Sequence, residues 1–311
     1  MTNRPLAAGV YAALVTPRRP NSIEADTGVL LDYLDAIVQA GVEGLVLFGA
    51  TGEFVHFDIE ERIRVSALAI KRSRVPVLVN VSHSTLAGAL ELGEKAVDSG
   101  ASGLLLMPPY FYRYPDEQIC EFYDQFIKIL DEKIPVYLYN LPDFTNPLSL
   151  ENLRRLLSTG AFAGIKDSGG GSAIFEELQP LRAAHPFQFL VGRDSLYMSA
   201  LQAGASGIVS GVAAAVPELI VALDRAIRGG DHARAGRLNE KLSEFMVYVD
   251  KFPATVAIKQ AAVARGWTSS HVAVPLDEDM AADVIAFHVW FRAWLQGILA
   301  ECKQSSAAPV A

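Results

Sequence analysis

The chain has 311 residues, of which 51% are hydrophobic and 20% are charged, and its net charge is −8. This composition can fill a large core, and the length suits a single α/β barrel. The negative charge argues against nucleic acid or an anionic membrane surface as a partner.

The chain carries no sign of a membrane span or of a secreted protein. No apolar run reaches about 18 residues without a charge or a turn former, and the amino terminus lacks the apolar segment of a signal peptide. The two cysteines, Cys120 and Cys302, lie far apart in stretches that look helical, so we expect free thiols. These features predict a cytoplasmic protein.

Short apolar runs rich in β-forming residues alternate with longer amphipathic segments along the chain. Near-continuous apolar runs are typical of parallel strands that are buried on both faces. The predicted strands are Val10–Val15, Gly44–Phe48, Val75–Val81, Gly103–Met107, Pro135–Tyr139, Phe162–Lys166, Phe187–Val191 and Gly207–Ser210. The predicted helices are Asp26–Ala40, Asp58–Lys71, Ser84–Asp98, Asp116–Leu130, Ser149–Leu157, Ser172–Arg182, Asp194–Ala203 and Pro217–Arg228. Most of them begin with Ser, Asp or Pro, which are common helix starts.

Eight consecutive βα units predict a (β/α)8 TIM barrel over residues 1–228. A doubly wound open sheet is the main alternative, but it usually shows a glycine-rich fingerprint after its first strand. Here the first strand is followed by Thr16-Pro17-Arg18-Arg19-Pro20 instead. We therefore rank the open sheet second.

A helical extension is predicted over residues 229–303, in the segments Asp231–Arg265 and Asp277–Glu301. It contains Trp267, Trp290 and Trp294, which are all the tryptophans of the chain. We expect these rings to pack the extension on the outside of the barrel or in a subunit interface. Residues 304–311 are expected to be disordered.

Lys166 ends one of the predicted strands and is followed at once by polar and glycine residues. In a TIM barrel, the carboxyl ends of the strands carry the active site. Burial disfavours the ammonium form, and a neutral amine attacks ketones to form a Schiff base. A lysine that reaches solvent or pairs with Asp167 is the alternative. The residues at the ends of the other strands decide between a reactive lysine and a lysine that reaches solvent or forms an ion pair.

The second and fifth strands place a turn and a phenol at the same rim. The turn Gly49-Ala50-Thr51-Gly52-Glu53 can point its backbone N–H groups at one spot, as a carboxylate site requires, although an ordinary βα turn is the alternative. Period-2 alternation puts Tyr137 and Tyr139 on one face of their strand, with Tyr139 nearer the mouth.

Three further strand ends supply candidate substrate-binding residues. The fourth is followed by an aromatic-rich loop with Tyr110 and Phe111, which could equally be packing at the rim. The seventh leads into Gly192 and Asp194, and the eighth contains Val209. Asp194 could accept hydroxyl hydrogen bonds, or it could simply cap the following helix.

An amine, a phenol and an amide-lined turn at one rim suit imine chemistry. The lysine would attack a ketone, the phenol would shuttle protons, and the turn would hold an adjacent carboxylate. A protonated imine withdraws electrons, so it stabilises a carbanion at the neighbouring carbon and allows a C–C bond to form or break.

Five segments, each weak alone, form a specific set in their order and spacing. They are Gly9-Val10 with Ala13-Leu14-Val15-Thr16-Pro17, Gly49-Ala50-Thr51-Gly52-Glu53, Tyr139-Asn140-Leu141-Pro142, Gly164-Ile165-Lys166-Asp167-Ser168 and Gly204-Ala205-Ser206-Gly207-Ile208-Val209-Ser210. Through them the chain, from about Gly9 to about Pro275, resembles the dihydrodipicolinate synthase / N-acetylneuraminate lyase family of pyruvate-dependent class I aldolases.

This resemblance implies a role for individual residues. Lys166 would form the Schiff base with pyruvate or another 2-oxo acid, and Tyr139 would transfer protons. Thr51, with the backbone N–H groups of Ala50 and Thr51, would hold the carboxylate, and the backbone around Val209 would line the imine. The resemblance also implies no cofactor besides the covalent lysine imine. It further implies a homotetramer of two dimers, with an aromatic residue of the fourth loop reaching across the dimer interface.

Three positions depart from the family pattern. Ala50 stands where the family commonly has Thr or Ser, so one hydroxyl of the proton relay is missing. The interface tyrosine of the synthase aligns with Phe111, although Tyr112 is adjacent. Phe144 stands where the synthase has an arginine for the carboxylate of its second substrate, and a phenyl ring cannot make such bonds. This argues against the synthase reaction.

The predicted function is a class I aldolase or lyase that forms or cleaves a 2-keto-3-deoxy sugar acid, or a related 2-oxo acid, from pyruvate and an aldehyde. Phe144 leaves open a less polar aldehyde. The alternatives are dehydration of the sugar acid, the 4-hydroxy-tetrahydrodipicolinate synthase reaction, and non-catalytic binding of a 2-oxo acid.

The six histidines are scattered without zinc-ligand spacing, so no metal is assigned. The run Gly169-Gly170-Gly171 is interpreted as a turn rather than a phosphate site.

Overall fold

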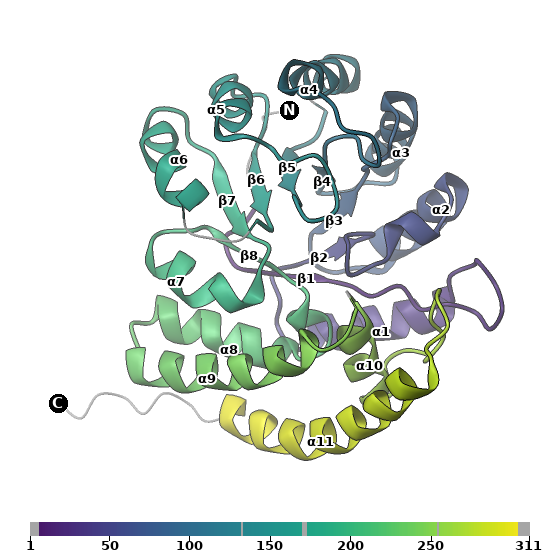
Figure 1. Ribbon diagram of the computed structural model, residues 1–311. Helices are drawn as coiled ribbons and strands as arrows, with labels where there is room; N and C mark the ends of the chain where they lie inside the picture. The colour runs from purple at the N-terminus through teal and green to yellow at the C-terminus, as the bar shows by residue number, and fades with distance from the viewer. Residues whose placement is uncertain (1–5, 132, 170–172, 254, 304–311) are drawn as a thin grey trace.

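Eight parallel strands close into a barrel in chain order, and helices surround it (Figure 1). The computed structural model describes residues 6–131, 133–169, 173–253 and 255–303. The strands are β1 (Val10–Ala13), β2 (Gly44–Leu47), β3 (Val77–Asn80), β4 (Gly103–Leu106), β5 (Val136–Asn140), β6 (Gly164–Asp167), β7 (Gln188–Val191) and β8 (Gly207–Ser210). The TIM-barrel prediction is therefore confirmed, and the open-sheet alternative is wrong.

The predicted strands all form, with small changes at their ends. β5 and β6 each run one residue further than expected, because Asn140 and Asp167 still pair in register. Lys166 is therefore the second-last residue of its strand rather than the last.

The helices of the barrel follow the strands as predicted. They are α1 (Thr27–Gln39), α2 (Ile59–Arg72), α3 (Leu86–Asp98), α4 (Asp116–Leu130), α5 (Leu150–Ser158), α6 (Ala173–Ala184), α7 (Tyr197–Gln202) and α8 (Pro217–Arg228). Three short 3₁₀ turns, η1 (Phe54–His56), η2 (Asp194–Leu196) and η3 (Val212–Ala214), follow β2, β7 and β8. The predicted helix start at Ser172 and the glycines 170 and 171 lie outside the described residues.

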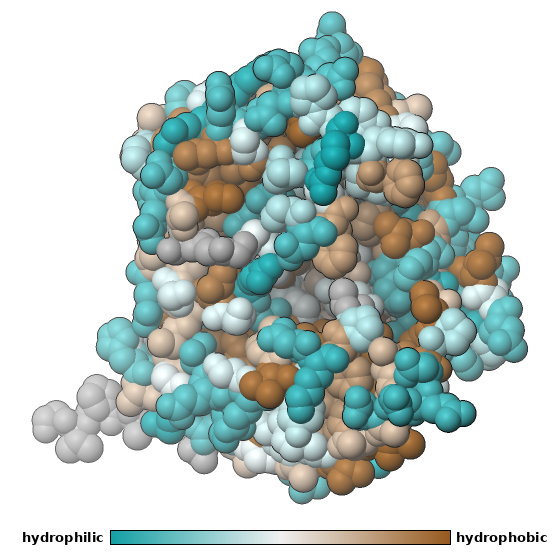
Figure 2. Space-filling view, in the orientation of Figure 1, coloured by the Kyte–Doolittle hydropathy of each residue, from teal (hydrophilic) through white to brown (hydrophobic). Residues whose placement is uncertain are grey.

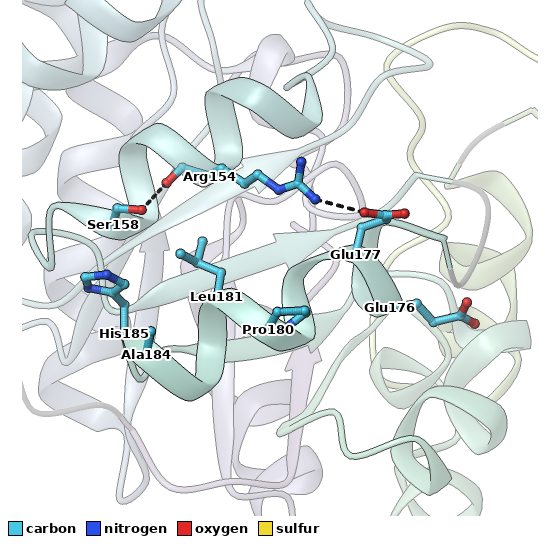
Figure 3. Close-up of a pocket in the computed structure, with 8 residues that line it drawn as sticks. All are labelled: Arg154, Ser158, Glu176, Glu177, Pro180, Leu181, Ala184 and His185. Carbon is cyan, nitrogen blue, oxygen red and sulfur yellow. Dashed lines mark hydrogen bonds and ion pairs between the residues drawn. The ribbon is translucent and has the colours of Figure 1, made fainter.

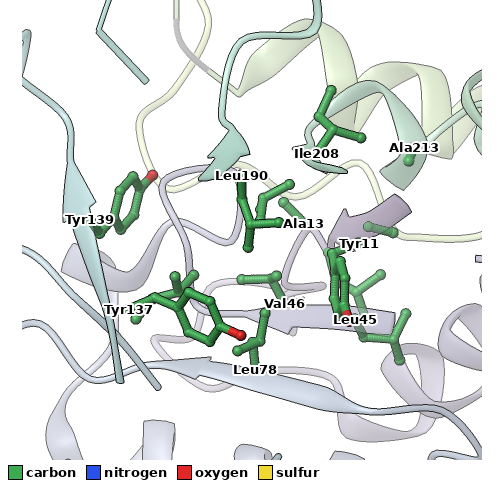
Figure 4. Close-up of a cluster of buried hydrophobic side chains, with 14 of the residues drawn as sticks. Tyr11, Ala13, Leu45, Val46, Leu78, Tyr137, Tyr139, Leu190, Ile208 and Ala213 are labelled. Carbon is green, nitrogen blue, oxygen red and sulfur yellow. The ribbon is translucent and has the colours of Figure 1, made fainter. Parts of the chain in front are cut away.

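Large aromatic rings fill the amino end of the barrel. Tyr11 and Tyr137 are fully buried there among aliphatic side chains of neighbouring strands (Figure 4). Gly44 leaves room for the Tyr11 ring, since a Cβ at this glycine would lie 2.4 Å from the ring. The Tyr137 hydroxyl donates to Gln188 at 2.6 Å and accepts the N–H of Leu6 at 3.2 Å. Side chains and the amino-terminal segment thus fill this end. We therefore expect the active site at the opposite end of the barrel, at the carboxyl ends of the strands.

The extension packs on one side of the barrel, beside α8 and α1 (Figure 1). It consists of α9 (His232–Val249), α10 (Val256–Ala264) and α11 (Glu278–Lys303). The segment expected as one stretch, Asp231–Arg265, is broken in two around Pro253, which cannot continue a helix interior. Trp290 and Trp294 stack on Phe245 of α9. The tail 304–311, which was expected to be disordered, lies outside the described residues.

The surface in view is mostly hydrophilic, with hydrophobic residues in separate small groups (Figure 2). No helix in the described part of the chain is both long enough and apolar enough to cross a membrane. Cys120 and Cys302 are free thiols.

Candidate active site

A cavity of about 220 Å³ opens at the carboxyl ends of the strands. Strands β1, β5, β6 and β8, the turns after β2, β7 and β8, and the extension all contribute to it. Its lining residues are Ala13, Ala50, Thr51, Tyr139, Leu141, Asp143, Lys166, Ser168, Gly192, Arg193, Asp194, Val209, Gly211, Val212, Met246, Val249, Thr255 and Ile258.

Lys166 and Tyr139 meet inside this cavity. They are register partners on β6 and β5, so both side chains project into the barrel at the same level. The Lys166 Nζ lies 3.8 Å from the centre of the Tyr139 ring. The Tyr139 hydroxyl forms no hydrogen bond with any described residue, and Ala50, which also lines the cavity, has no hydroxyl to offer it. The Lys166 amine and the Tyr139 hydroxyl are therefore both free to interact with a substrate.

The turn after β2 offers backbone donors to the cavity. The N–H groups of Gly52 and Glu53 donate to the carbonyls of Gly49 and Ala50, each at 3.0 Å. The N–H groups of Ala50 and Thr51 have no acceptor among the described residues. These two groups are therefore available to bind a carboxylate.

Close packing holds this turn in place. A Cβ at Gly52 would lie 3.0 Å from the carbonyl oxygen of Leu14, so the backbone needs glycine there. The Thr16 hydroxyl donates to the Gly52 carbonyl at 2.8 Å. Phe48 and Glu53 flank the turn with left-handed backbone angles, each with φ of 55°. Such strained residues persist only where the surroundings hold them, so the turn is rigid before a ligand arrives.

Asp194 ties the ends of β7 and β8 together. Its carboxylate accepts the Ser210 hydroxyl and the N–H groups of Gly211 at 3.1 Å and Val212 at 3.3 Å. Burial raises the pKa of Asp194, while these hydrogen bonds lower it in part. The carboxylate thus holds the backbone beside Val209, and it does not cap the helix that follows it in sequence.

The wall beside Lys166 is polar. Arg193 lies between two loops: its Nη2 donates to Asp143 at 2.9 Å, and its Nε donates to the Ser168 carbonyl at 3.2 Å. The pair is partly open to solvent, with exposed fractions of 44% for Arg193 and 59% for Asp143. The sequence pattern predicted Gly192 and Asp194 of the loop after β7 as binding residues, but neither Arg193 nor Asp143.

The extension supplies an apolar wall that the sequence did not predict. Met246 and Val249 of α9, and Thr255 and Ile258 at the start of α10, line the cavity. The extension therefore reaches the active site and does more than cover the outside of the barrel.

A buried ion pair fastens α10 to the turn after β2. Lys259 Nζ lies 2.8 Å from the Glu53 carboxylate, and the side chains are only 1% and 8% exposed. Burial lowers the pKa of Lys259, and Glu53 counteracts part of that effect.

Three predicted residues do not line the cavity. The Phe144 ring is 63% exposed, because the turn that directs Asp143 to the cavity sends Phe144 outward. Phe111 is 86% exposed at the tip of its loop. Tyr110 packs edge-on against Phe54, with ring centres 5.6 Å apart.

The described part of the chain contains no group of three or more His, Cys, Asp or Glu side chains that could hold a metal ion. The groups that face the cavity are an amine, a phenol, two carboxylates, a guanidinium and backbone amides. An amine, a phenol and backbone amides in one cavity can bind a carboxylate and react with a neighbouring carbonyl.

Residues 6–284 match the model of the dihydrodipicolinate synthetase family. An uncharacterized DapA-like lyase of Halobacterium salinarum is 34% identical over 283 residues, which cover 88% of this chain and 91% of the relative. A 4-hydroxy-tetrahydrodipicolinate synthase of Methanoculleus marisnigri is 31% identical over 280 residues, covering 87% and 93%.

YagE of Escherichia coli K12, named a putative 2-dehydro-3-deoxy-D-gluconate aldolase, is 31% identical over 262 residues, covering 81% of this chain and 86% of YagE. The solved structure of YagE in complex with pyruvate superposes with a TM-score of 0.84 at 27% identity, covering 94% of this chain and 98% of that structure.

Proposed function

Because this chain belongs to the dihydrodipicolinate synthetase family of pyruvate-dependent lyases, we propose that it forms or cleaves a 2-keto-3-deoxy sugar acid through an imine between pyruvate and Lys166. The observation that carries the proposal is the meeting of three groups in one cavity: the Lys166 amine, the Tyr139 phenol and the free N–H groups of Ala50 and Thr51.

In the cleavage direction, the Lys166 amine attacks the keto carbon of the sugar acid, and loss of water leaves a protonated imine. The carboxylate beside that carbon binds to the N–H groups of Ala50 and Thr51. The Tyr139 phenol gives its proton to the hydroxyl that leaves as water when the imine forms, and the resulting phenolate then accepts the proton of the substrate hydroxyl two carbons from the imine carbon. The C–C bond then breaks, the aldehyde leaves, and the bonding electrons move into the imine to give an enamine. Protonation of the enamine and addition of water release pyruvate and restore the amine.

The preference for a sugar acid rests on the polar wall of the cavity and on a relative. Asp143, Ser168 and Arg193 form the polar part of the cavity lining, where we expect the aldehyde fragment to bind. Such groups exchange hydrogen bonds with hydroxyls. YagE, whose name is that of a putative sugar-acid aldolase, is 31% identical.

The synthase reaction is the second candidate, because several relatives bear the name 4-hydroxy-tetrahydrodipicolinate synthase. Against it stands Phe144, which replaces an arginine in the sequence pattern and points its ring to solvent. Dehydration of the sugar acid would use the same imine and is separated from aldol chemistry by its products.

Borohydride reduction in the presence of pyruvate tests the imine. We expect irreversible pyruvyl labelling of Lys166, located by peptide mass spectrometry, and no labelling when pyruvate is left out. A panel of aldehydes, each incubated with pyruvate, then tests which aldehyde is the acceptor. The products are identified by their mass. Efficient turnover of aspartate semialdehyde in preference to hydroxylated aldehydes would overturn the sugar-acid assignment, and absence of labelling would overturn the imine.

We also propose that the chain assembles as a homotetramer in which Phe111 contacts a second copy. Phe111 and Tyr112 pack edge-on at 5.0 Å, yet they are 86% and 66% exposed. The left-handed φ of 82° at Phe111 is unfavourable for a bulky residue, which supports a role for this loop tip beyond the single chain. Light scattering of the wild type and of Phe111→Asp tests this: the variant should shift to smaller species, and a wild-type monomer would contradict it.

A further inference from the structure

Arg193 and Asp143 form an ion pair across the mouth of the cavity. Asp143 lies in the loop after β5, Arg193 in the loop after β7, and the Ser168 carbonyl that Arg193 also binds follows β6. The pair therefore spans the end of the strand that carries Lys166. Any aldehyde that approaches the imine from this side meets the pair.

The two charged side chains at the mouth of the cavity already balance each other. The Arg193 guanidinium and the Asp143 carboxylate are 2.9 Å apart and form an ion pair. The guanidinium of Arg193 commits Nη2 to Asp143 and Nε to a backbone carbonyl, and its Nη1 has no partner among the described residues. An incoming carboxylate would have to compete with Asp143 for this cation, and it would face like charge.

A neutral aldehyde that carries hydroxyls can bind to the same ion pair without this competition. Arg193 donates hydrogen bonds and Asp143 accepts them, so a hydroxyl can pair with either partner while the ion pair stays formed. The pair thus combines an attraction for hydroxyls with a built-in repulsion of anions, which is how binding sites commonly discriminate between ligands.

We infer that the Arg193–Asp143 pair sets acceptor specificity, selecting neutral hydroxylated aldehydes and excluding aldehydes that carry a carboxylate. The inference rests on the proposed function. Asp143 is the excluding element, because it holds Nη2 of the guanidinium and its negative charge repels an incoming carboxylate. Arg193 and Asp143 are specificity residues in this assignment, and Lys166 and Tyr139 remain the reacting groups.

The test uses the full chain with pyruvate and two acceptors, glyceraldehyde and glyoxylate, and compares kcat/KM for each. In Asp143→Asn the guanidinium loses its counter-ion, so the ratio of glyoxylate to glyceraldehyde turnover should rise by about tenfold or more. In Arg193→Gln glyceraldehyde turnover should fall with no gain for glyoxylate. The double variant Asp143→Asn with Arg193→Gln should also show no rise in glyoxylate turnover, because that rise requires an Arg193 guanidinium without its counter-ion.

A matched surface pair provides the control. Arg154 and Glu177 lie 2.8 Å apart with exposed fractions of 50% and 58%, close to the values of the Arg193–Asp143 pair, but they bridge α5 and α6 on the outside of the barrel (Figure 3). Glu177→Gln removes a comparable ion pair and should leave the acceptor ratio unchanged. Exposed pairs of this kind contribute little to stability, so all these variants should fold.

Pyruvate labelling of Lys166 separates a failure of this inference from a failure of the proposed function. Labelling needs no acceptor and should persist in every variant. If labelling persists but the acceptor ratio of Asp143→Asn stays within about twofold of the wild type, the inference is overturned. A wild type that prefers glyoxylate to glyceraldehyde also overturns it. Loss of labelling in the wild type overturns the imine chemistry itself.

Discussion

The Lys166 Nζ lies 3.8 Å from the centre of the Tyr139 ring, over its face rather than beside its hydroxyl. The face of an aromatic ring carries partial negative charge and attracts cations. An imine formed on this nitrogen would be protonated and would lie over the same face. In the proposed mechanism Tyr139 therefore makes two separate contributions, with its ring stabilising the cationic intermediate and its hydroxyl moving protons.

Substitutions at Tyr139 should separate these contributions. Tyr139→Phe keeps the ring and loses the hydroxyl, so we expect turnover to fall by roughly 10²–10⁴-fold while borohydride labelling with pyruvate persists. Tyr139→Leu loses both and should also weaken labelling. The measurements are kcat on the best acceptor and the labelled fraction of Lys166. An unchanged kcat in Tyr139→Phe would remove the proton-transfer role.

Lys166→Ala removes the amine that forms the imine in the proposed mechanism. We expect turnover and borohydride labelling to vanish while the circular dichroism spectrum and the oligomeric state stay those of the wild type. The reason is that the Lys166 side chain, which lies over the Tyr139 ring, takes part in no ion pair or side-chain hydrogen bond among the described residues. Residual turnover above the background would show that the imine forms elsewhere.

The barrel and its central pair of residues could be predicted from local sequence pattern. Buried parallel strands are short continuous apolar runs, and such runs locate all eight strands. Period-2 alternation then brings Tyr139 and Lys166 to the same rim, and the register pairs them. These features depend only on residues close to each other in sequence.

Other parts of the site depend on tertiary packing and were missed. Lys259 and Glu53 are separated by 206 positions, and nothing local indicates that they pair. The side-chain direction of Phe144 was also unpredictable, because it is set by a turn in which the N–H groups of Phe144 and Thr145 both donate to the Leu141 carbonyl. The position of a loop residue within a sequence motif does not determine the direction of its side chain.

Asp194 should give the protein a measurable dependence of stability on pH. Burial raises the pKa of this carboxyl, so the folded state binds the proton more tightly than the unfolded state. The contribution of the group is therefore fully present at low pH and is lost as the pH rises through the raised pKa. Asn at this position cannot titrate. We therefore expect the free energy of unfolding of the wild type to fall relative to Asp194→Asn as the pH rises above about 4, the ordinary range of an Asp.

Urea denaturation of both proteins at several pH values measures this difference. Asp194→Asn also weakens the bonds to the Gly211 and Val212 amides, which shifts its stability by a constant amount but adds no pH dependence. A difference between the two proteins that does not change with pH would contradict the prediction.

The Lys259–Glu53 pair should be costly to break from one side. Both side chains are buried, so Lys259→Met removes the close partner of an interior carboxylate, whose other ionic neighbour is the partly exposed His56 at 3.5 Å, and should lower the free energy of unfolding by about 3–5 kcal/mol. The double variant Lys259→Met with Glu53→Gln removes both charges of the pair, and we expect it to recover much of that loss. The surface pair Lys241–Glu244 on α9, with exposed fractions of 42% and 45%, is the control, and Lys241→Met should cost about 0–1 kcal/mol.

The same pair should also affect substrate binding, because Glu53 ends the turn that presents the N–H groups of Ala50 and Thr51. Once Lys259 is gone, the turn is no longer fastened to α10, so we expect KM for pyruvate to rise more than kcat falls. The measurement is steady-state kinetics with pyruvate varied at a saturating aldehyde concentration, at a temperature where the variant stays folded. A variant that loses stability but keeps the wild-type KM would show that the pair holds α10 without positioning the turn.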